Sequence, residues 1–152
     1  MNETTQNPPA ALPDVAGWKF PGGQHVLAPE VDAAFRKAVE SKAGQGTRAH
    51  PALAFVIAQS AMGVSVAELL ALCDFRVEDG PMLVQLDLDF TSPLQTGVAY
   101  TVNGQIISLT RKPSRAFGFA DSLVFELHLT TPSAGRVATV RNTWILPRRG
   151  LT

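Results

Sequence analysis

Apolar residues recur at helical spacing in three stretches of the first half of the chain. The first predicted helix begins at Pro29, because proline favours the first helical position and acidic residues follow it in the first turn. We expect this helix to end near the glycines of residues 44–46. The second predicted helix covers 51–62 and is apolar on most sides, which is typical of a buried helix. Ser65 and Glu68 form a capping box that predicts a short third helix.

In the second half of the chain apolar and polar residues alternate, which is typical of β-strands with one dry and one wet face. Four long strands are predicted, over 82–90, 98–110, 122–130 and 136–146. The dry face of the first is expected to hold Met82, Val84, Leu86, Leu88 and Phe90. A short strand or extended segment precedes the first helix, over 18–27.

A helix that is apolar all round needs cover on most sides, and a curved antiparallel sheet supplies that cover. The pattern therefore predicts an α+β fold in which the sheet wraps around the helix at 51–62. Such a sheet leaves unpaired edges, so we expect dimerisation, either edge to edge or face to face.

The chain has 152 residues, which corresponds to one domain. Residues 1–17 are rich in Pro, Asn and Thr without periodicity; they predict a mobile tail, and the domain then covers 18–152. Charged residues make up 17% of the chain, below the usual proportion of about 25%. We therefore expect part of the surface to meet another protein or an apolar ligand.

Basic and acidic residues number 13 each, and the resulting zero net charge argues against a nucleic-acid-binding protein. The single cysteine excludes an internal disulfide and the common cysteine-based zinc sites, and we expect neither a metal nor a cofactor. No apolar run reaches the roughly 18 residues of a membrane span. The first residues lack the basic and apolar regions of a secretory signal, so a cytoplasmic protein without a membrane partner is expected.

Four stretches carry a resemblance to a known family. They are the strand-then-helix entry at 26–35 (VLAPEVDAAF), the sequence Arg48-Ala49-His50-Pro51 before the apolar helix, the turn Pro93-Leu94-Gln95-Thr96-Gly97, and the closing strand at 135–147. In this order they resemble the MaoC-like dehydratase and (R)-specific enoyl-CoA hydratase superfamily, which has the hotdog fold. The resemblance implies a ligand site between two protomers and an acyl-CoA or other acyl thioester as the ligand. The implied partner is a second copy or another hotdog chain.

Two departures concern the catalytic groups that this resemblance implies. The family's loop has the form glycine-aspartate-x-asparagine-proline-x-histidine, and its Asp and His activate a water. The corresponding residues 41–46 (SKAGQG) include neither. The family also has a glycine whose backbone N–H binds the thioester carbonyl at the helix start. Pro51 stands there without an N–H, and the amide of Ala52 is the candidate replacement.

His50 is the main catalytic candidate, because it precedes the central helix and an imidazole can act as an acid or a base. The alternative is a capping or packing role. His25 is a second candidate, with Glu30 or Asp32 as its partner, although both acids are also explained by the helix dipole. The third histidine, His128, is expected on the wet face of its strand in a cross-strand polar pair.

Arg111, Lys112 and Arg115 form a basic cluster in a predicted turn, and the resemblance implies that such cations hold the phosphates of acyl-CoA. The alternative is a solvated turn. Asp87 and Asp89 share one face of a strand, where paired carboxylates serve acid–base chemistry or a metal, or simply a solvated face.

Several apolar residues have two interpretations as well. Cys73 lies in an apolar helix and is expected to be a core residue. An acyl tunnel or ordinary core packing explains Phe55, Val56, Met62 and Tyr100 equally well.

Two functions of different class follow from the resemblance. One is a divergent enoyl-thioester hydratase or dehydratase built around His50. The other is a non-catalytic hotdog subunit that binds the thioester while a partner carries the Asp and His. An acyl-CoA thioesterase is a third alternative. A cone-shaped barrel of the ketosteroid-isomerase type is the alternative fold, and the turn at 93–97 with the single buried helix favours hotdog.

Overall fold

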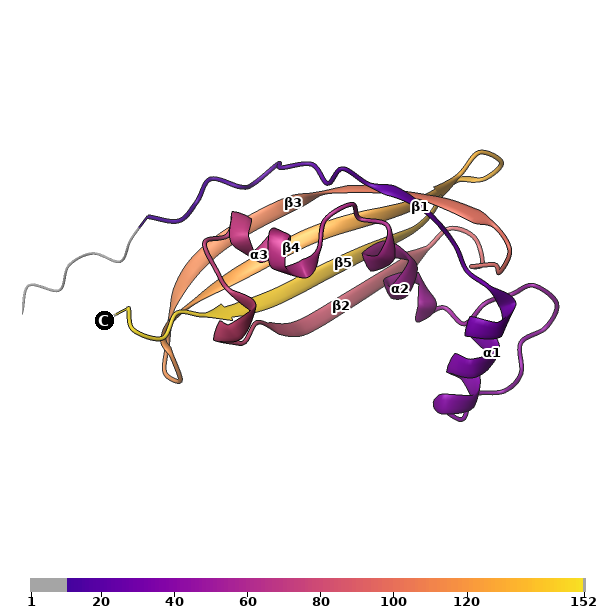
Figure 1. Ribbon diagram of the computed structural model, residues 1–152, viewed down its shortest axis with the longest axis horizontal. Helices are drawn as coiled ribbons and strands as arrows, with labels where there is room; N and C mark the ends of the chain where they lie inside the picture. Colours follow the sequence, from indigo (N-terminus) through magenta and orange to yellow (C-terminus); the bar gives the residue numbers. More distant parts are fainter. Residues whose placement is uncertain (1–10, 152) are drawn as a thin grey trace, which may run out of the picture.

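The computed structural model describes residues 11–151, which form a curved five-stranded antiparallel sheet with α2 and α3 on one face and α1 at one end (Figure 1). Neighbouring strands follow the order β1-β3-β4-β5-β2. The strands are β1 (Gly23–Val26), β2 (Met82–Phe90), β3 (Ala99–Ser114), β4 (Gly118–Thr131) and β5 (Gly135–Pro147). The helices are α1 (Pro29–Ala38), α2 (Leu53–Ser60) and α3 (Val66–Leu72), and the 3-10 turn η1 (Val77–Asp79) follows them.

The helix α2 lies on the inner face of the sheet and packs against β1, β3, β4 and β5. The side chains that it buries completely or almost completely are Leu53, Ala54, Ile57 and Ala58. Phe55 is half-buried and Val56 is 38% exposed, so the buried helix predicted from the sequence keeps one apolar stripe uncovered. The capping box at the start of α3 is confirmed, since Ser65 Oγ accepts the Glu68 N–H at 3.1 Å and Glu68 Oε2 accepts the Ser65 N–H at 2.8 Å.

The core lies between α2 and the inner face of β4 and β5. Buried residues alternate along β4 at Leu123, Phe125, Leu127 and Leu129. On β5 the facing residues are Val140, Asn142 and Trp144, which pair with three of these positions. The predicted strands and the hairpin turn between them are confirmed, and Gly135 supplies the positive φ of 65° that this turn needs.

The edge strand β2 differs from its predicted pattern because of a β-bulge. The pairing register with β5 shifts after Leu83, so Leu83 and not Met82 lies opposite the inward-facing Trp144. One extra residue in the strand reverses which side chains face inward on the side before the bulge. After the bulge, Leu86 and Leu88 lie opposite the buried Asn142 and Val140, as the predicted alternation requires. The expected dry face is also largely uncovered, since Met82, Val84 and Phe90 are 38%, 54% and 36% exposed.

The domain begins earlier in the chain than Trp18. Residues 1–10, which make up most of the predicted tail, lie outside the described residues. Val15 is buried, and the Gly17 N–H donates to the carbonyl of Ile106 at 2.8 Å. Val15 and Gly17 of the predicted tail therefore lie against the sheet, because their segment runs beside β3 and hydrogen-bonds to it.

The helix α1 is shorter than predicted, because it ends at Ala38 and not at 44–46. Glu40 adopts the left-handed φ of 54°, and the Ser41 N–H donates to the carbonyl of Arg36 at 2.8 Å. This hydrogen bond closes the helix before the glycines are reached. Within residues 11–151, no helix has both the length and the apolar character needed to cross a membrane.

Candidate functional site

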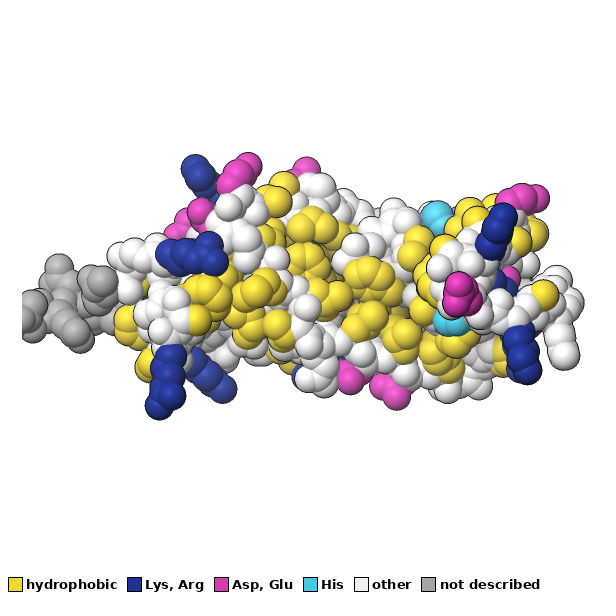
Figure 2. Space-filling model, turned by 90° about the horizontal axis from the view of Figure 1, so that it is seen from below, with side chains coloured by type: hydrophobic (Ala, Val, Ile, Leu, Met, Phe, Trp, Pro, Cys, Tyr) yellow, Lys and Arg dark blue, Asp and Glu magenta, His cyan; other side chains and the backbone are white. Residues whose placement is uncertain are grey.

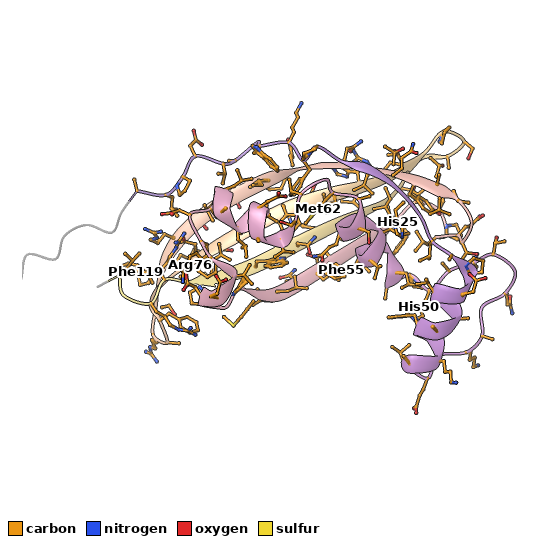
Figure 3. The ribbon with its side chains drawn as sticks, viewed as in Figure 1. His25, His50, Phe55, Met62, Arg76 and Phe119 are labelled. Carbon is orange, nitrogen blue, oxygen red and sulfur yellow. The ribbon has the colours of Figure 1, made fainter. Side chains whose placement is uncertain are left out.

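The candidate site lies where the segment 47–52 leads from α1 to α2. The backbone N–H of His50 donates to Asp32 Oδ1 at 2.6 Å, and the imidazole Nδ1 accepts the Ala52 N–H at 3.2 Å. The ring packs edge-on against Phe35 of α1, with ring centroids 5.0 Å apart. Figure 3 shows His50 beside α1. The capping and packing role that the sequence allows for His50 is therefore what these contacts describe.

The first backbone N–H groups of α2 all have partners within the chain. Pro51 has none to offer, and the Ala52 N–H is held by His50. The Leu53 N–H donates to the carbonyl of His50 at 3.0 Å, and the Ala54 N–H donates to the carbonyl of Pro51 at 3.1 Å. A helix start normally leaves such donors open to a ligand. Here the amide of Ala52, the candidate replacement donor, points back to an imidazole.

An ion pair fixes the loop in which the resemblance places the catalytic Asp and His. Arg36 Nε donates to Asp32 Oδ2 at 2.9 Å, and its two remaining nitrogens donate to the carbonyls of Lys42 and Arg48 at 3.1 and 3.4 Å. Burial raises the pKa of Asp32, but the hydrogen bonds from the His50 N–H and Arg36 outweigh it, and the pKa is lowered. Asp32 is therefore a charged anchor that ties α1 to the start of α2.

Two cavities of about 420 Å³ each lie beside this segment. The polar cavity is lined by α1 and the 41–48 loop, including Asp32, Arg36 and Lys37. The apolar cavity is lined by residues near the end of β2 and the start of α2, including Pro51 and Phe90. Arg48 lines both cavities, whereas His50 is absent from the lining of either.

The other two histidines take different positions. His25 lies on β1 opposite Tyr100 (Figure 3). Of its two expected partners, Glu30 and Asp32, the second is engaged by Arg36 and by His50 instead. On β4, His128 Nε2 lies 4.0 Å from Glu126 and its Nδ1 lies 3.3 Å from Thr139 Oγ1.

The contacts of His128 confirm the predicted polar pair on the outer face of the sheet. Burial lowers the pKa of His128, and the nearby Arg136 lowers it further, although Glu126 acts in the opposite direction. The structure thus gives His128 a role in strand pairing.

The basic cluster lies far from His50 within one chain. The turn that joins β3 to β4 is at the end of the sheet opposite α1 (Figure 1). Arg111 and Lys112 lie on β3 itself, so the predicted turn begins later, at Arg115. Arg111 is bound to the buried Asp121, with Nε to Oδ1 at 2.7 Å, whereas Lys112 and Arg115 are exposed.

The remaining candidates are mostly structural. Asp87 and Asp89 lie opposite Arg141 and Thr139 on the outer face of the sheet, where Asp87 accepts a hydrogen bond from a neighbouring glutamine. Cys73 is fully buried, and burial raises the pKa of its thiol to about 11, as expected for a core residue. No group of His, Cys, Asp and Glu within residues 11–151 is arranged to hold a metal ion.

The residues proposed for an acyl tunnel divide into two sets. Met62 and Tyr100 are 2% exposed and belong to the core, and the Tyr100 hydroxyl accepts the Gln95 N–H at 2.9 Å. Phe55 and Val56 lie on the uncovered stripe of α2. None of the four lines the two cavities described above.

Sequence reasoning missed the roles of Arg36 and Arg48. The i,i+4 spacing of Asp32 and Arg36 was an available signal for their ion pair. No local pattern marks the bond from Arg36 to the carbonyl of Arg48, 12 residues away, or the position of Arg48 between two cavities. It also missed Asn142, which is fully buried on β5 and whose amide atoms have no hydrogen-bond partner among the described residues. The available signal was its position, because Asn142 is a polar residue at an inward-facing place in the alternation of β5, between Val140 and Trp144.

Comparison with solved structures confirms the hotdog fold. The HadBC complex, a 3R-hydroxyacyl-ACP dehydratase from Mycobacterium tuberculosis, matches with a TM-score of 0.59 and 20% identity over 87% of this chain and 97% of that chain. The ChsH1–ChsH2 complex from the same organism has a TM-score of 0.66 at 11% identity, over 88% and 86% of the two chains. A MaoC-like dehydratase from Rhodospirillum rubrum has a TM-score of 0.56 at 14% identity, over 90% and 94%.

Further similar structures are (R)-hydratases. No protein-family model and no curated protein matches the sequence. The predicted hotdog fold, and not the cone-shaped barrel, is therefore correct. Because a fold hosts several chemistries, the function has to be argued from the residues of the site.

Proposed function

We propose that this chain is a non-catalytic hotdog subunit that binds an acyl thioester beside a second hotdog chain, which carries the catalytic residues. The start of α2 is the observation that supports it most strongly. Catalysis at a thioester carbonyl needs preorganised donors directed at the developing oxyanion. At this helix start Pro51 has no N–H, and the N–H groups of His50 and Ala52 are bound to Asp32 and to the His50 ring.

The second support is that no acid–base pair is arranged beside His50 among the residues that the structure describes. Hydration of an enoyl thioester needs a base for the water and a proton donor for the α-carbon. The loop at 41–46 has neither Asp nor His. Asp32, the carboxylate beside His50, already accepts hydrogen bonds from Arg36 and from the His50 backbone. His50 would thus act without an oriented partner.

An uncovered apolar band supports the second chain. Val56 of α2 and Leu83, Val84 and Phe90 of β2 are all more than a third exposed. Figure 2, which views this side of the molecule, shows hydrophobic side chains gathered along its middle. One edge of β2 is also unpaired in the sheet. An apolar band next to an open sheet edge fits a partner that extends the sheet and covers α2.

The two solved complexes favour a heteromer over a homodimer, because HadBC and ChsH1–ChsH2 each pair two differently named chains. If the β2 edges of two hotdog chains pair antiparallel about a two-fold axis, the α1 end of one chain lies beside the β3–β4 turn of the other. Lys112 and Arg115 of this chain would then contact the phosphates of a thioester that is bound at the partner.

The test separates binding from catalysis. Isothermal titration of the purified chain with butyryl-CoA should show binding, while crotonyl-CoA and longer enoyl-CoAs should keep their conjugated-thioester absorbance. Free thiol should not appear, since its release would indicate the thioesterase alternative.

Hydration by the wild-type chain that is lost in His50→Ala and kept in His128→Ala would overturn the proposal in favour of the divergent hydratase. Absence of any thioester binding would overturn it as well. His128→Ala is the matched control, because it removes the same ring from the outer face of the sheet, away from α2.

A further inference from the structure

Arg48 is the cation best placed to meet a ligand in this chain. It lines both of the cavities beside the start of α2, each of about 420 Å³. Its side chain is exposed and has no ion pair among residues 11–151. A guanidinium at the boundary of two cavities can present its planar set of donors to an oxyanion in either one.

The backbone around Arg48 is held in place although its guanidinium is uncommitted. Arg48 bridges Gln95 in antiparallel fashion, and the flanking Ala49 N–H donates to the carbonyl of Leu94 at 2.8 Å. On the other side, the carbonyl of Arg48 accepts a hydrogen bond from Arg36 at 3.4 Å. A fixed backbone reduces the conformational entropy that a bound ligand must remove.

The charge of the polar cavity favours an anion. Its charged lining groups are Asp32, Arg36, Lys37 and Arg48. Asp32 and Arg36 form an ion pair at 2.9 Å and neutralise each other. The positive charges of Lys37 and Arg48 remain, and both residues are exposed. The neighbouring cavity differs, because its lining includes Ala49, Pro51, Phe90, Pro93 and Leu94, with two hydroxyl residues.

From these two cavities we propose that Arg48, assisted by Lys37, binds the anionic group of an amphipathic thioester whose apolar part occupies the cavity at Pro51. This inference rests on the proposed thioester function and specifies the ligand. The anionic group is an oxyacid, either a phosphate of the thioester carrier or a carboxylate at the far end of the acyl chain. The basic residues Lys112 and Arg115 do not reach this position within the same chain.

Three probes distinguish the two sources of the anion in isothermal titration. Butyryl-CoA carries phosphates, the butyryl thioester of N-acetylcysteamine carries no charge, and the glutaryl thioester of N-acetylcysteamine adds only a terminal carboxylate. Arg48→Gln should weaken binding of the charged probe whose anion the site holds, butyryl-CoA or the glutaryl thioester, roughly tenfold. This is the effect of losing one charge-assisted hydrogen bond. Lys37→Gln should weaken it by about two- to threefold.

The control is Arg76→Gln, because the side chain of Arg76, the residue before η1, is 76% exposed and its ion pairs with Glu78 and Asp79 are long, at 3.9 Å. It removes the same charge and should leave every affinity unchanged. Far-ultraviolet circular dichroism and thermal unfolding should show that Arg48→Gln folds like the wild type. Weakening of butyryl-CoA alone assigns the anion to the carrier phosphate, and weakening of the glutaryl thioester alone assigns it to the acyl carboxylate.

Two outcomes would overturn the inference and leave the proposed function intact. In one, Arg48→Gln and the double variant with Lys37→Gln bind all three probes like the wild type. In the other, they lose the uncharged probe as strongly as the charged ones. Failure of the wild type to bind any probe would instead overturn the thioester function, and the Arg48 site with it.

Discussion

The carboxylate of Asp121 is the buried charge on which the far end of the domain depends, and Asp121→Asn should be strongly destabilising. Asp121 is fully buried on β4. It accepts hydrogen bonds from Arg111 at 2.7 and 3.0 Å and from Arg148 at 2.6 Å. The hydrogen bond to Asp121 raises the pKa of Arg111, although burial acts against it. Arg148 also donates to the carbonyls of Cys73 and Asp74, so the cluster joins β3, β4 and β5 to the end of α3.

The size of the destabilisation follows from the two buried arginines that the substitution leaves without a carboxylate partner. Asparagine keeps the shape of the side chain, but Arg111 and Arg148, with side chains only 11% and 13% exposed, lose their shared counter-charge. Removing one partner from a buried ion pair costs about 3–5 kcal/mol. For a chain of this size, that loss lowers the melting temperature by roughly 6–20 °C.

Urea unfolding followed by tryptophan fluorescence measures the effect, with Glu126→Gln as a matched control on the same strand. Glu126 pairs with Arg141 at 2.7 Å, but this arginine side chain is 42% exposed. Its loss should cost less than about 1 kcal/mol. The reasoning would be refuted if Asp121→Asn and Glu126→Gln lowered the free energy of unfolding equally. A loss below about 1 kcal/mol for Asp121→Asn would mean that the cluster is solvated.

Three further predictions test other buried groups. Asn142→Leu should raise the free energy of unfolding by about 1 kcal/mol in the same urea assay, because it removes an amide without hydrogen-bond partners among the described residues; destabilisation would mean that the amide has a partner. The pKa of Asp32 lies below its ordinary value of 3.8, so its stabilising contribution is complete above pH about 4 and is lost at lower pH. Wild-type and Asp32→Asn unfolding free energies should therefore converge on acidification, and a constant difference down to pH about 2 would contradict this. Burial raises the pKa of Cys73 to about 11, so a thiol reagent at pH about 8 should label it only after unfolding, and rapid labelling of folded protein would refute this.

The parts of the fold that the sequence predicts correctly depend on local patterns. The capping box of Ser65 and Glu68 is a contact between residues three positions apart, and the structure reproduces it. The alternation along β4 reports which side chains face the core, and the buried Leu123 and Leu127 follow it. In both cases the physical cause lies within a few residues of the chain, where periodicity can detect it.

The parts that the sequence does not predict depend on contacts between distant segments. The bulge after Leu83 is fixed by pairing with β5, more than 50 residues later. The alternating letters of β2 carry no sign of it. Val15 is buried because its segment lies along β3, which composition alone cannot indicate. An open edge such as β2 likewise looks like a core strand in sequence, since its apolar residues alternate in the same way although several of them stay exposed.

In the candidate site, too, the sequence does not predict the roles of side chains whose partners lie in distant segments. The sequence explains Asp32 by the helix dipole, since an acidic residue in the first turn needs no other reason. In the structure Asp32 accepts the N–H of His50, 18 residues later, and pairs with Arg36. Arg111 shows the converse error, because its basic neighbours suggested a ligand site while its partner Asp121 lies on the next strand. The presence of a charged residue in the sequence does not reveal whether its side chain already forms an ion pair within the fold.

The two departures from the catalytic pattern are coupled through Asp32. In place of a catalytic Asp and His, the loop at 41–46 is held by Arg36, whose charge Asp32 balances. The same Asp32 carboxylate takes the His50 N–H at the helix start, where Pro51 already lacks one. A glycine at position 51 alone would thus add one donor at the helix start, beside a loop that contains neither Asp nor His. Restoring the acid–base pair in the loop would in turn require release of the Arg36 contacts. The loop at 41–46 and the start of α2 therefore share structural contacts through Asp32 and Arg36, which supports the proposal of a subunit whose partner performs the chemistry.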